Sequence, residues 1–216
     1  MKTYLPDKNV AIIFILIMIA WVGAWNIWLA LSNNFEFSSI ATTGFIYWTV
    51  AKIIIWILPA LWLMQKTDCK IGEIFRVSSW RKCLTWGIGL GGVLVLTSIG
   101  GRYFNNNLSI PNPISFAFVN AIIIAPIFEE FLMRGAIMKA LRKNHKFVLV
   151  NSVTAVLFVI LHFPGWYYTG TLLSNLSSVT GGALTIFVIG WLCGLATEKG
   201  ETVIAGIIVH TLNNLI

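Results

Sequence analysis

Four ionisable side chains stand at positions of this sequence where apolar residues are expected. Glu129 and Glu130 lie in the middle of one long apolar run, and His162 and His210 lie in two later runs. An ionisable group at the centre of a bilayer costs about 2.5–3.5 kcal/mol on insertion scales, so such groups usually face one another and carry function. The four residues therefore predict a catalytic or proton-handling site inside a membrane. A polar clamp that only holds helices together is the alternative.

The spacing around the two glutamates separates their roles. Glu130 and Arg134 are four residues apart and share one helix face, which predicts an ion pair. Glu129 points about 100° away around the helix and has no local partner, which leaves it available as a general base. Pro126, three residues earlier, removes one backbone hydrogen bond and can open the helix beside the site.

The histidines belong to separate helices. His162 follows directly on the segment 147–161, which ends in Phe158-Val159-Ile160-Leu161, while His210 and Asn214 are four residues apart and share a face of the last apolar segment. At a rise of ~1.5 Å per residue, Glu129, His162 and His210 lie roughly 14–22 Å from the cytoplasmic ends of their segments. Because these depths are similar, we expect one shared site.

The composition indicates that most of the chain is surrounded by lipid. Of its 216 residues, 57% are hydrophobic and 11% are charged, and the mean hydropathy is +0.82. A soluble domain carries about 25% charged residues, so a water-soluble enzyme is excluded. The net charge of +7 does not indicate a nucleic-acid partner, because the basic residues stand between apolar runs, where they set topology and contact anionic lipid.

A helix that spans a bilayer needs about 20 apolar residues, and the sequence offers seven candidate segments. They cover residues 10–31, 39–64, 83–100, 116–141, 147–161, 179–197 and 202–216. The predicted fold is an all-α, polytopic integral membrane protein with about seven transmembrane helices in a single membrane domain, residues 1–216. We also expect a short amphipathic helix near residues 71–77 and an uncharged loop over 164–178. A cleaved signal peptide is the alternative for the first segment, which is longer than the usual 7–15 residues.

Basic residues predict the orientation of these segments. With the N-terminus in the cytoplasm, the inside loops hold twelve basic residues and the outside loops hold only Arg102. The twelve are Lys2, Lys8, Lys66, Lys70, Arg76, Arg81, Lys82, Lys139, Arg142, Lys143, Lys146 and Lys199. The distribution predicts a cytoplasmic N-terminus and a C-terminus outside.

Some other residues receive structural interpretations. Lys52 is a charge inside the second segment without an obvious acidic partner, and we expect it to snorkel or to line a water-filled cavity. Cys69, Cys83 and Cys193 show no close spacing, which predicts reduced, unreactive thiols. The ten tryptophans stand mostly near segment ends and predict an interfacial belt.

Three motifs occur in order, each late in its own apolar segment. They are Glu129-Glu130-x-x-x-Arg134-Gly135, Phe158-x-x-x-His162 and His210-x-x-x-Asn214, and Gly190-x-x-x-Gly194 precedes the last of them. Together they resemble the CAAX protease and bacteriocin-processing family (CPBP, also called Abi), intramembrane proteases related to the Ras-converting CAAX endopeptidase. The resemblance covers roughly residues 121–214. It implies a CAAX-protease-like helical core over residues 114–216, preceded by N-terminal helices over 1–113.

The resemblance implies hydrolysis of peptide bonds by an activated water. Glu129 would be the general base and His162 would help to hold the water, while His210 and Asn214 would stabilise the oxyanion or complete a metal site. The ion pair of Glu130 and Arg134 would support the site. Two mechanisms fit: a Zn²⁺ ion held by Glu129, His162 and His210, or a metal-free reaction in which Glu129 and His162 polarise the water directly.

Functions of other classes fit part of the same evidence. The family resemblance also implies a bacteriocin self-immunity or regulatory protein that acts by binding. A proton-coupled transporter could use Glu129 and His162 as a relay, but the sequence shows no repeated half, which many transporters have. The expected partners are a peptide or membrane-protein substrate and membrane lipid. Residue usage favours a bacterial plasma membrane, and the substrate and oligomeric state stay open.

Overall fold

The computed structural model describes residues 7–34, 41–104 and 115–215, and within these residues every regular element is a helix. In chain order the elements are α1 (Asp7–Asn34), α2 (Ala41–Lys52), η2 (Ile53–Ile57), α3 (Leu58–Lys66), α4 (Ile71–Ile74), α5 (Trp80–Phe104), α6 (Phe116–Val119), η3 (Asn120–Ile124), α7 (Ala125–Glu130), η4 (Phe131–Met138), α8 (Lys139–Leu141), α9 (Phe147–Tyr168), α10 (Leu172–Ser177), α11 (Ala183–Gly200) and α12 (Val203–Asn214). The elements named η are π-helical turns, whose hydrogen bonds span five residues. Predicted features at Lys2, residues 39–40 and residues 105–113 lie outside the described residues.

Several of these elements join into continuous helices. The α2–η2–α3 series forms one rod, and the series from α6 to α8 forms another that begins and ends at the predicted residues 116 and 141. Within the described residues, six helices are long and apolar enough to cross a membrane. The prediction of an all-α, multi-pass membrane fold is therefore confirmed.

The predicted seventh span differs from the other six. Helix α12 has 12 residues, which corresponds to about 18 Å at 1.5 Å per residue, whereas the hydrocarbon core of a bilayer is about 30 Å thick. It therefore cannot cross alone. The count is corrected to six long helices and one short helix that packs against them.

The fifth span is longer than predicted. The sequence predicts an end at residue 161 and a loop from Pro164, but α9 continues through Pro164 to Tyr168, and the short helix α10 follows. Proline removes a single N–H donor, and packing of the next turn offsets this loss. The rings of Trp25 and Tyr168 stack with centroids 5.7 Å apart. As a result, His162 lies inside a helix and not at its end.

Two prolines follow directly on π-helical turns. The N–H of Ala125 donates to the carbonyl of Asn120, five residues back, and Pro126 comes next. Pro126 has no N–H, so one donor is missing that could have reached the carbonyl of Ala121 (five residues back) or of Ile122 (four residues back). The same arrangement recurs in α2–η2–α3, where the N–H of Leu58 donates to Ile53 and Pro59 follows.

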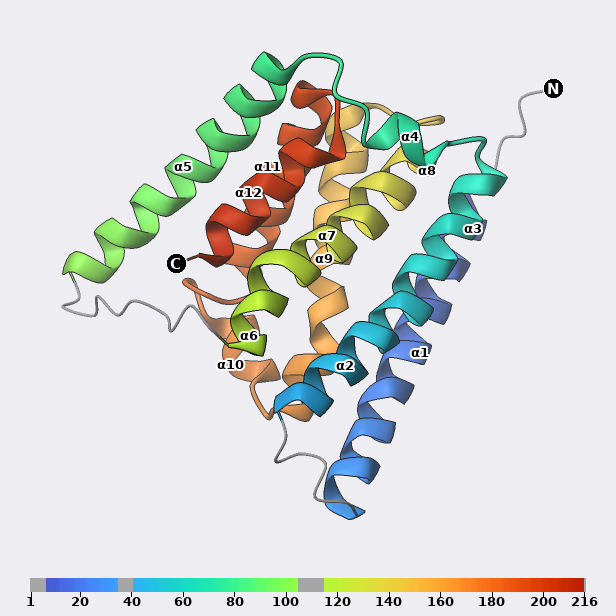
Figure 1. Cartoon of the computed structure of the whole chain (residues 1–216), viewed down its shortest axis with the longest axis vertical. Coiled ribbons are helices and arrows are strands. Elements are labelled where there is room, and N and C mark those ends of the chain that lie inside the picture. The colour runs from blue at the N-terminus through green and yellow to red at the C-terminus, as the bar shows by residue number, and fades with distance from the viewer. Residues whose placement is uncertain (1–6, 35–40, 105–114, 216) are drawn as a thin grey trace.

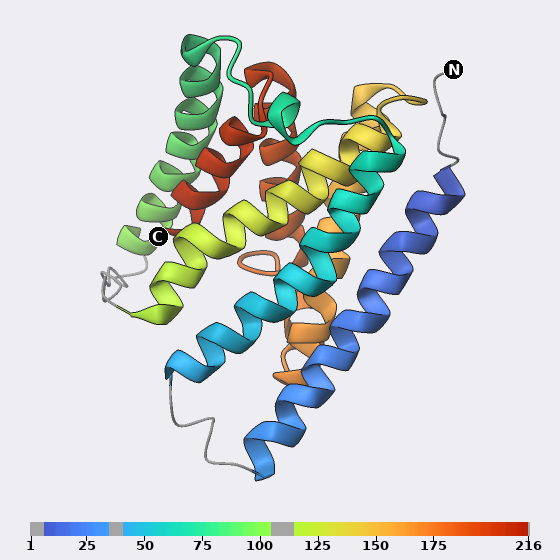
Figure 2. The same ribbon diagram turned by 45° about the vertical axis from the view of Figure 1, so that its right-hand side comes forward.

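The rod of residues 116–141 lies at the centre of the molecule. It runs obliquely between the α2–α3 rod and helix α12 (Figures 1 and 2), and it also packs against α9. On one side α11 and α12 form a hairpin that packs against α5 and α9, while on the other side α1 packs against α9 and η2. The central rod, which carries both glutamates, is therefore in contact with the α2–η2–α3 rod, with α9 and with α12.

Apolar packing joins both halves of the chain. The larger core cluster combines Phe14 and Trp21 of α1 and Leu63 of α3 with Leu132 of η4 and Phe158 of α9. A smaller cluster links Cys83 of α5 to α11 and α12. Burial of such side chains on several helices fixes the position of the central rod relative to α9 and α12.

Candidate active site

The most deeply buried polar group of the central rod is the predicted pair of Glu130 and Arg134. Both side chains are 0% exposed, and Nη1 of Arg134 lies 3.1 Å from Oε1 of Glu130. The other guanidinium nitrogen, Nη2, donates to the backbone carbonyl of Gly190 in α11. The absence of a side chain at Gly190 allows this contact, since a Cβ there would lie 3.2 Å from Nη2. The pair therefore ties the rod to α11.

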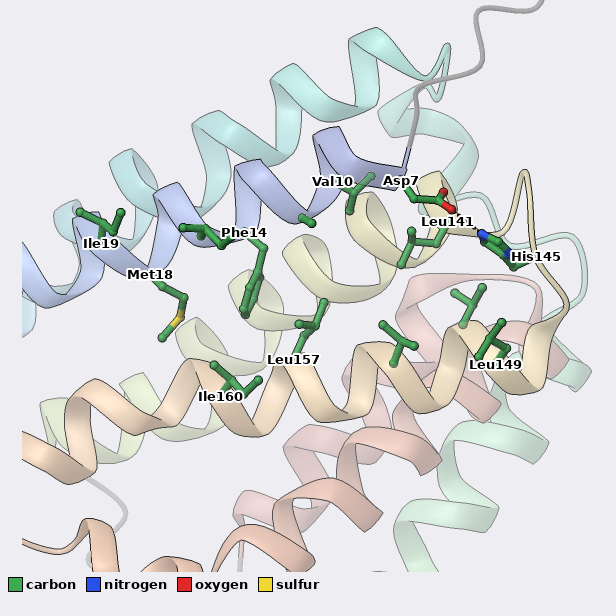
Figure 3. Close-up of a pocket in the computed structure, with 14 residues that line it drawn as sticks. Asp7, Val10, Phe14, Met18, Ile19, Leu141, His145, Leu149, Leu157 and Ile160 are labelled. Atoms are coloured by element: carbon green, nitrogen blue, oxygen red, sulfur yellow. Dashed lines mark hydrogen bonds and ion pairs between the residues drawn. The ribbon is translucent and has the colours of Figure 1, made fainter.

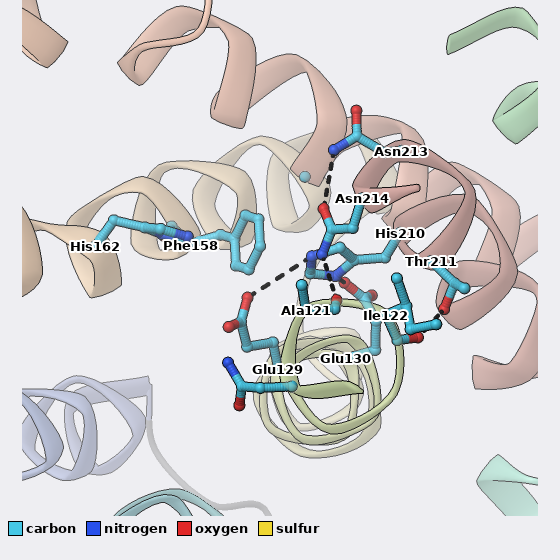
Figure 4. A network of polar contacts seen from close by, with 12 residues as sticks. Ala121, Ile122, Glu129, Glu130, Phe158, His162, His210, Thr211, Asn213 and Asn214 are labelled. Atoms are coloured by element: carbon cyan, nitrogen blue, oxygen red, sulfur yellow. Dashed lines mark hydrogen bonds and ion pairs between the residues drawn. The ribbon is translucent and has the colours of Figure 1, made fainter. Parts of the chain in front are cut away.

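His210 connects this buried pair to the second glutamate. Its Nδ1 lies 3.1 Å from Oε1 of Glu130 and donates to that carboxylate, while its Nε2 lies 3.8 Å from Oε2 of Glu129. The second distance exceeds a direct hydrogen bond. The two carboxylates point to different sides of the helix (Figure 4), as their 100° separation predicts. His210 thus holds a fixed tautomer and presents its other ring nitrogen toward Glu129.

Phe158 organises the two histidines. Its ring makes edge-on contacts with His162 and His210, with centroid distances of 5.0 and 5.6 Å, and the guanidinium of Arg134 lies 4.9 Å from its centroid. The backbone carbonyl of Phe158 accepts a hydrogen bond of 2.8 Å from Nδ1 of His162. With Nδ1 protonated, Nε2 of neutral His162 carries the free lone pair. This nitrogen can accept a proton or hold a water.

A small cavity brings Glu129 and His162 together. It has a volume of about 170 Å³, and its lining residues are Trp21, Trp25, Lys52, Trp56, Glu129, Leu161, His162, Gly165 and Trp166. Four of the ten tryptophans belong to this wall. They surround the candidate base, a position that the prediction of an interfacial belt did not include.

Lys52 is the residue of this cavity that the sequence-based site did not include. It is 7% exposed, its Nζ lies 3.4 Å from Oδ1 of Asn120, and it lies 5.3 Å from the ring centroid of Trp56. Two positions were predicted for Lys52, snorkelling to the interface or lining a cavity. The structure shows the second. An isolated charge inside an apolar segment was the signal that could have assigned it to the site.

Asn214 lies beside the backbone of the central rod. Its Nδ2 donates to the carbonyl of Ala121 at 2.8 Å, and Oγ1 of Thr211 donates to the carbonyl of Ile122 at 3.1 Å. These are the two carbonyls within reach of the N–H that Pro126 lacks. Helix α12 is therefore anchored on the opened turn through Thr211 and Asn214, and the catalytic role of Asn214 stays a prediction.

The donor groups present do not form the predicted zinc set. Among the residues that the structure describes, one group of three or more His, Cys, Asp or Glu ligand atoms lies within 4.8 Å of one another, namely Glu130, Cys193 and His210. Neither Glu129 nor His162 belongs to it, so the three predicted zinc ligands do not cluster within that distance in this structure. In the group that does cluster, Arg134 already neutralises Glu130.

A larger apolar groove lies away from this chemistry. It has a volume of about 660 Å³, runs between α1 and α9, and ends at a pair formed by Asp7 and His145 (Figure 3). Oδ2 of Asp7 lies 2.5 Å from Nε2 of His145. Its lining offers no nucleophile or second carboxylate, so the smaller cavity at Glu129 is the candidate site.

One comparison with known proteins covers the second half of the chain. Residues 111–216 match a family model described as type II CAAX prenyl endopeptidase Rce1-like. No curated protein and no solved structure matches the chain. The matched region includes the central rod and the helices α9 to α12, and so both glutamates, Arg134, His162 and His210.

Proposed function

Because the chain belongs, through residues 111–216, to the type II CAAX prenyl endopeptidase Rce1-like family, which is a family of proteases, we propose that it is an intramembrane endopeptidase. In this proposal a water activated by Glu129 and His162, without a metal, hydrolyses a peptide bond of a peptide or membrane-protein substrate. The observation that carries the proposal is that Glu129 and His162 line the same cavity inside the membrane-spanning helices.

The cavity has the properties that water activation requires. Its volume of about 170 Å³ corresponds to about five or six water molecules at ~30 Å³ each. A carboxylate and an imidazole with a free Nε2 face this space. Apolar walls strengthen the electrostatic interactions of both groups, because they screen charges less than bulk water does.

The proposed steps balance with the residues present. Glu129 takes a proton from the water, whose oxygen bonds to the carbonyl carbon of the scissile bond, and His162 holds that water in line. The oxyanion that forms is stabilised by N–H donors, for which the second amide hydrogen of Asn214 and the Nε2–H of His210 in its protonated form are the candidates. Glu129 then returns the proton to the leaving nitrogen as the C–N bond breaks.

The inner ion pair supports this chemistry indirectly. Arg134 neutralises Glu130, and Glu130 in turn accepts the Nδ1 hydrogen of His210. A second negative charge next to Glu129 is thereby avoided, and the ring of His210 keeps one orientation. We propose a supporting role for both residues.

Orientation and location follow from the basic residues. We propose that the protein resides in a bacterial plasma membrane with its N-terminus in the cytoplasm, because the basic residues of the described connections gather on one side of the predicted topology. Lipid is then its environment, and a peptide or protein is its substrate.

The experiment that tests the proposal combines cleavage with metal analysis. The detergent-purified wild type and the Glu129→Gln and His162→Ala variants are incubated with a fluorogenic peptide library, with and without chelator, and their metal content is measured. The proposal expects cleavage by the wild type that chelator does not reduce and that both variants lose, while all three proteins unfold at similar temperatures. Cleavage by Glu129→Gln would contradict the role of Glu129.

Two other outcomes lead to different functions. Stoichiometric zinc that is lost with Glu129→Gln, together with inhibition by chelator, would replace the metal-free route with a metalloprotease. If neither metal nor cleavage were found, the self-immunity or regulatory function by binding would become the better explanation.

A further inference from the structure

The cavity beside Glu129 contains a cation that the proposed reaction does not use. Lys52 lies at the end of α2, is buried, and can donate three hydrogen bonds through its ammonium group. The structure gives it one acceptor, Oδ1 of Asn120, and the ring of Trp56. Among the residues described, no carboxylate forms an ion pair with it. A buried ammonium with so few partners is costly unless a ligand completes them.

Two tryptophans of the cavity wall carry indole N–H donors that lack an acceptor among the described residues. Trp25 and Trp56 line the cavity, and in the described part of the chain the indole Nε1 of each is buried without a hydrogen-bond partner. An indole N–H can only donate. The cavity wall therefore combines one ammonium and two indole donors that need acceptors, and this excess of donors favours an anionic oxygen ligand.

The size and walls of the cavity limit that ligand. Its volume of about 170 Å³ accommodates a carboxylate with a short stretch of peptide, and Trp21, Leu161 and Trp166 add apolar surface. Glu129 also lines it, so a second carboxylate would be repelled unless a cation lay nearby. Lys52 supplies that cation in a setting where little water screens it.

We infer that Lys52, with the indole N–H groups of Trp25 and Trp56, binds a carboxylate of the peptide substrate next to Glu129. This inference rests on the proposed function and adds a substrate class to it: peptides with a negative charge close to the scissile bond. The carboxylate belongs either to a free C-terminus or to an Asp or Glu side chain. All three binding residues precede residues 111–216, so they lie outside the family match.

The test measures binding as well as cleavage. Three acetylated apolar tripeptides are titrated into the full-length, detergent-purified protein: a free acid, its amide, and an amide with one Glu side chain. The change in tryptophan fluorescence gives each dissociation constant. The inference expects the wild type to bind at least one carboxylate peptide about 10–100-fold more tightly than the neutral amide, as charge-assisted hydrogen bonds allow. The peptide that binds identifies the source of the carboxylate.

Variants of two lysines on the same rod complete the design. In Lys52→Met the carboxylate peptide and the neutral amide are expected to bind with about equal dissociation constants. Lys52→Arg is expected to restore part of the preference for the carboxylate. Lys66→Met is the matched control, because Lys66 is exposed at the end of α3 beside Trp62 and does not line the cavity. It should keep the full preference.

Several results would overturn the inference. Equal binding of acid and amide by the wild type, or an unchanged ratio in Lys52→Met, would exclude a carboxylate site at Lys52. So would a uniform fall in kcat for all peptides in Lys52→Met with no change in the KM ratio, because Lys52 would then act through Glu129. Cleavage of neutral amides that depends on Glu129 would still support the proposed function, so the two failures are distinguishable.

Discussion

Two polar regions share the central rod, and they differ in whether their charged groups are paired. On the α11–α12 side, Glu130 accepts from both Arg134 and His210, and Arg134 also donates to the carbonyl of Gly190, although Oε2 of Glu130 and Nε of Arg134 have no partner among the described residues. On the α1–α9 side, Glu129 and Lys52 face a cavity with few partners. The inner cluster is built for stability and the cavity is left free for a ligand. Glu129 and Glu130 are adjacent on one helix, yet the first faces a ligand cavity and the second belongs to a stabilising ion pair.

The largest effect expected from breaking the inner cluster comes from Arg134→Met. It leaves the carboxylate of Glu130, which is 0% exposed, without its cation, and loss of one partner of a buried pair costs about 3–5 kcal/mol. Thermal unfolding in detergent measures this. The matched control is Arg142→Met, whose pair with Glu198 at 2.8 Å is about one-third exposed and should contribute about 1 kcal/mol or less. Similar losses in both variants would remove the distinction between the two regions.

Gly190→Ala tests the same cluster through packing. A Cβ at Gly190 would lie 2.9 Å from Cδ1 of Phe158 and 3.2 Å from Nη2 of Arg134, and such overpacking costs about 1–3 kcal/mol. We expect a lower unfolding temperature and weaker cleavage, because Phe158 also positions His162. Gly92→Ala on α5, where a Cβ meets nothing within 4 Å, should cause no loss. If Gly190→Ala left the unfolding temperature and cleavage unchanged, the packing of α11 against Phe158 and Arg134 would not be tight enough to matter.

Thr211→Val tests how α12 is held. The substitution keeps the shape of the side chain but removes the hydroxyl that donates to the carbonyl of Ile122, and loss of such a bond costs about 1 kcal/mol. Cleavage should fall as well, because His210 lies on the same short helix. Thr97→Val on α5 is the control, because that hydroxyl bonds only to carbonyls of its own helix and is exposed. Equal behaviour of the two variants would contradict the anchoring role.

The smallest effect is expected at the turn between α11 and α12, far from both regions. Hydrogen bonds from Lys82 and from Ser78, together with the charge of Lys82, lower the pKa of Glu201. A carboxyl whose folded pKa is below its unfolded value stabilises the fold above its ordinary pKa, and this contribution is lost as pH falls through the folded value. Glu201→Gln should slightly lower the unfolding temperature near neutral pH and leave it unchanged in acid. The opposite pH dependence would exclude the hydrogen bonds as its cause.

The contrast between the two regions also explains what the sequence could predict. The pairing of Glu130 with Arg134 follows from a four-residue spacing, which is a local rule. The partner of Lys52 could not be predicted, because Asn120 is distant along the chain and meets it only when the α2–η2–α3 rod packs beside the central rod. The roles proposed for Glu129, His162, His210 and Asn214 stay predictions until they are tested.

The boundaries of the helices show the same limit. The ends of the central rod at residues 116 and 141 follow from composition, whereas α9 passes its proline because Tyr168 stacks on a tryptophan from another helix. The short length of α12 was visible in the sequence, but its packing on the central rod depends on tertiary contacts.

The way α12 is anchored has a consequence for how the sequence can diverge. Asn214 and Thr211 bind carbonyl oxygens, which every amino acid provides, so the identities of residues 121 and 122 carry no information for this contact. The information resides in Pro126, whose missing N–H leaves those oxygens available. In a library that randomises all five positions, selection for function should leave residues 121 and 122 variable among apolar types. It should retain Pro126, Thr211 and Asn214 together or lose them together.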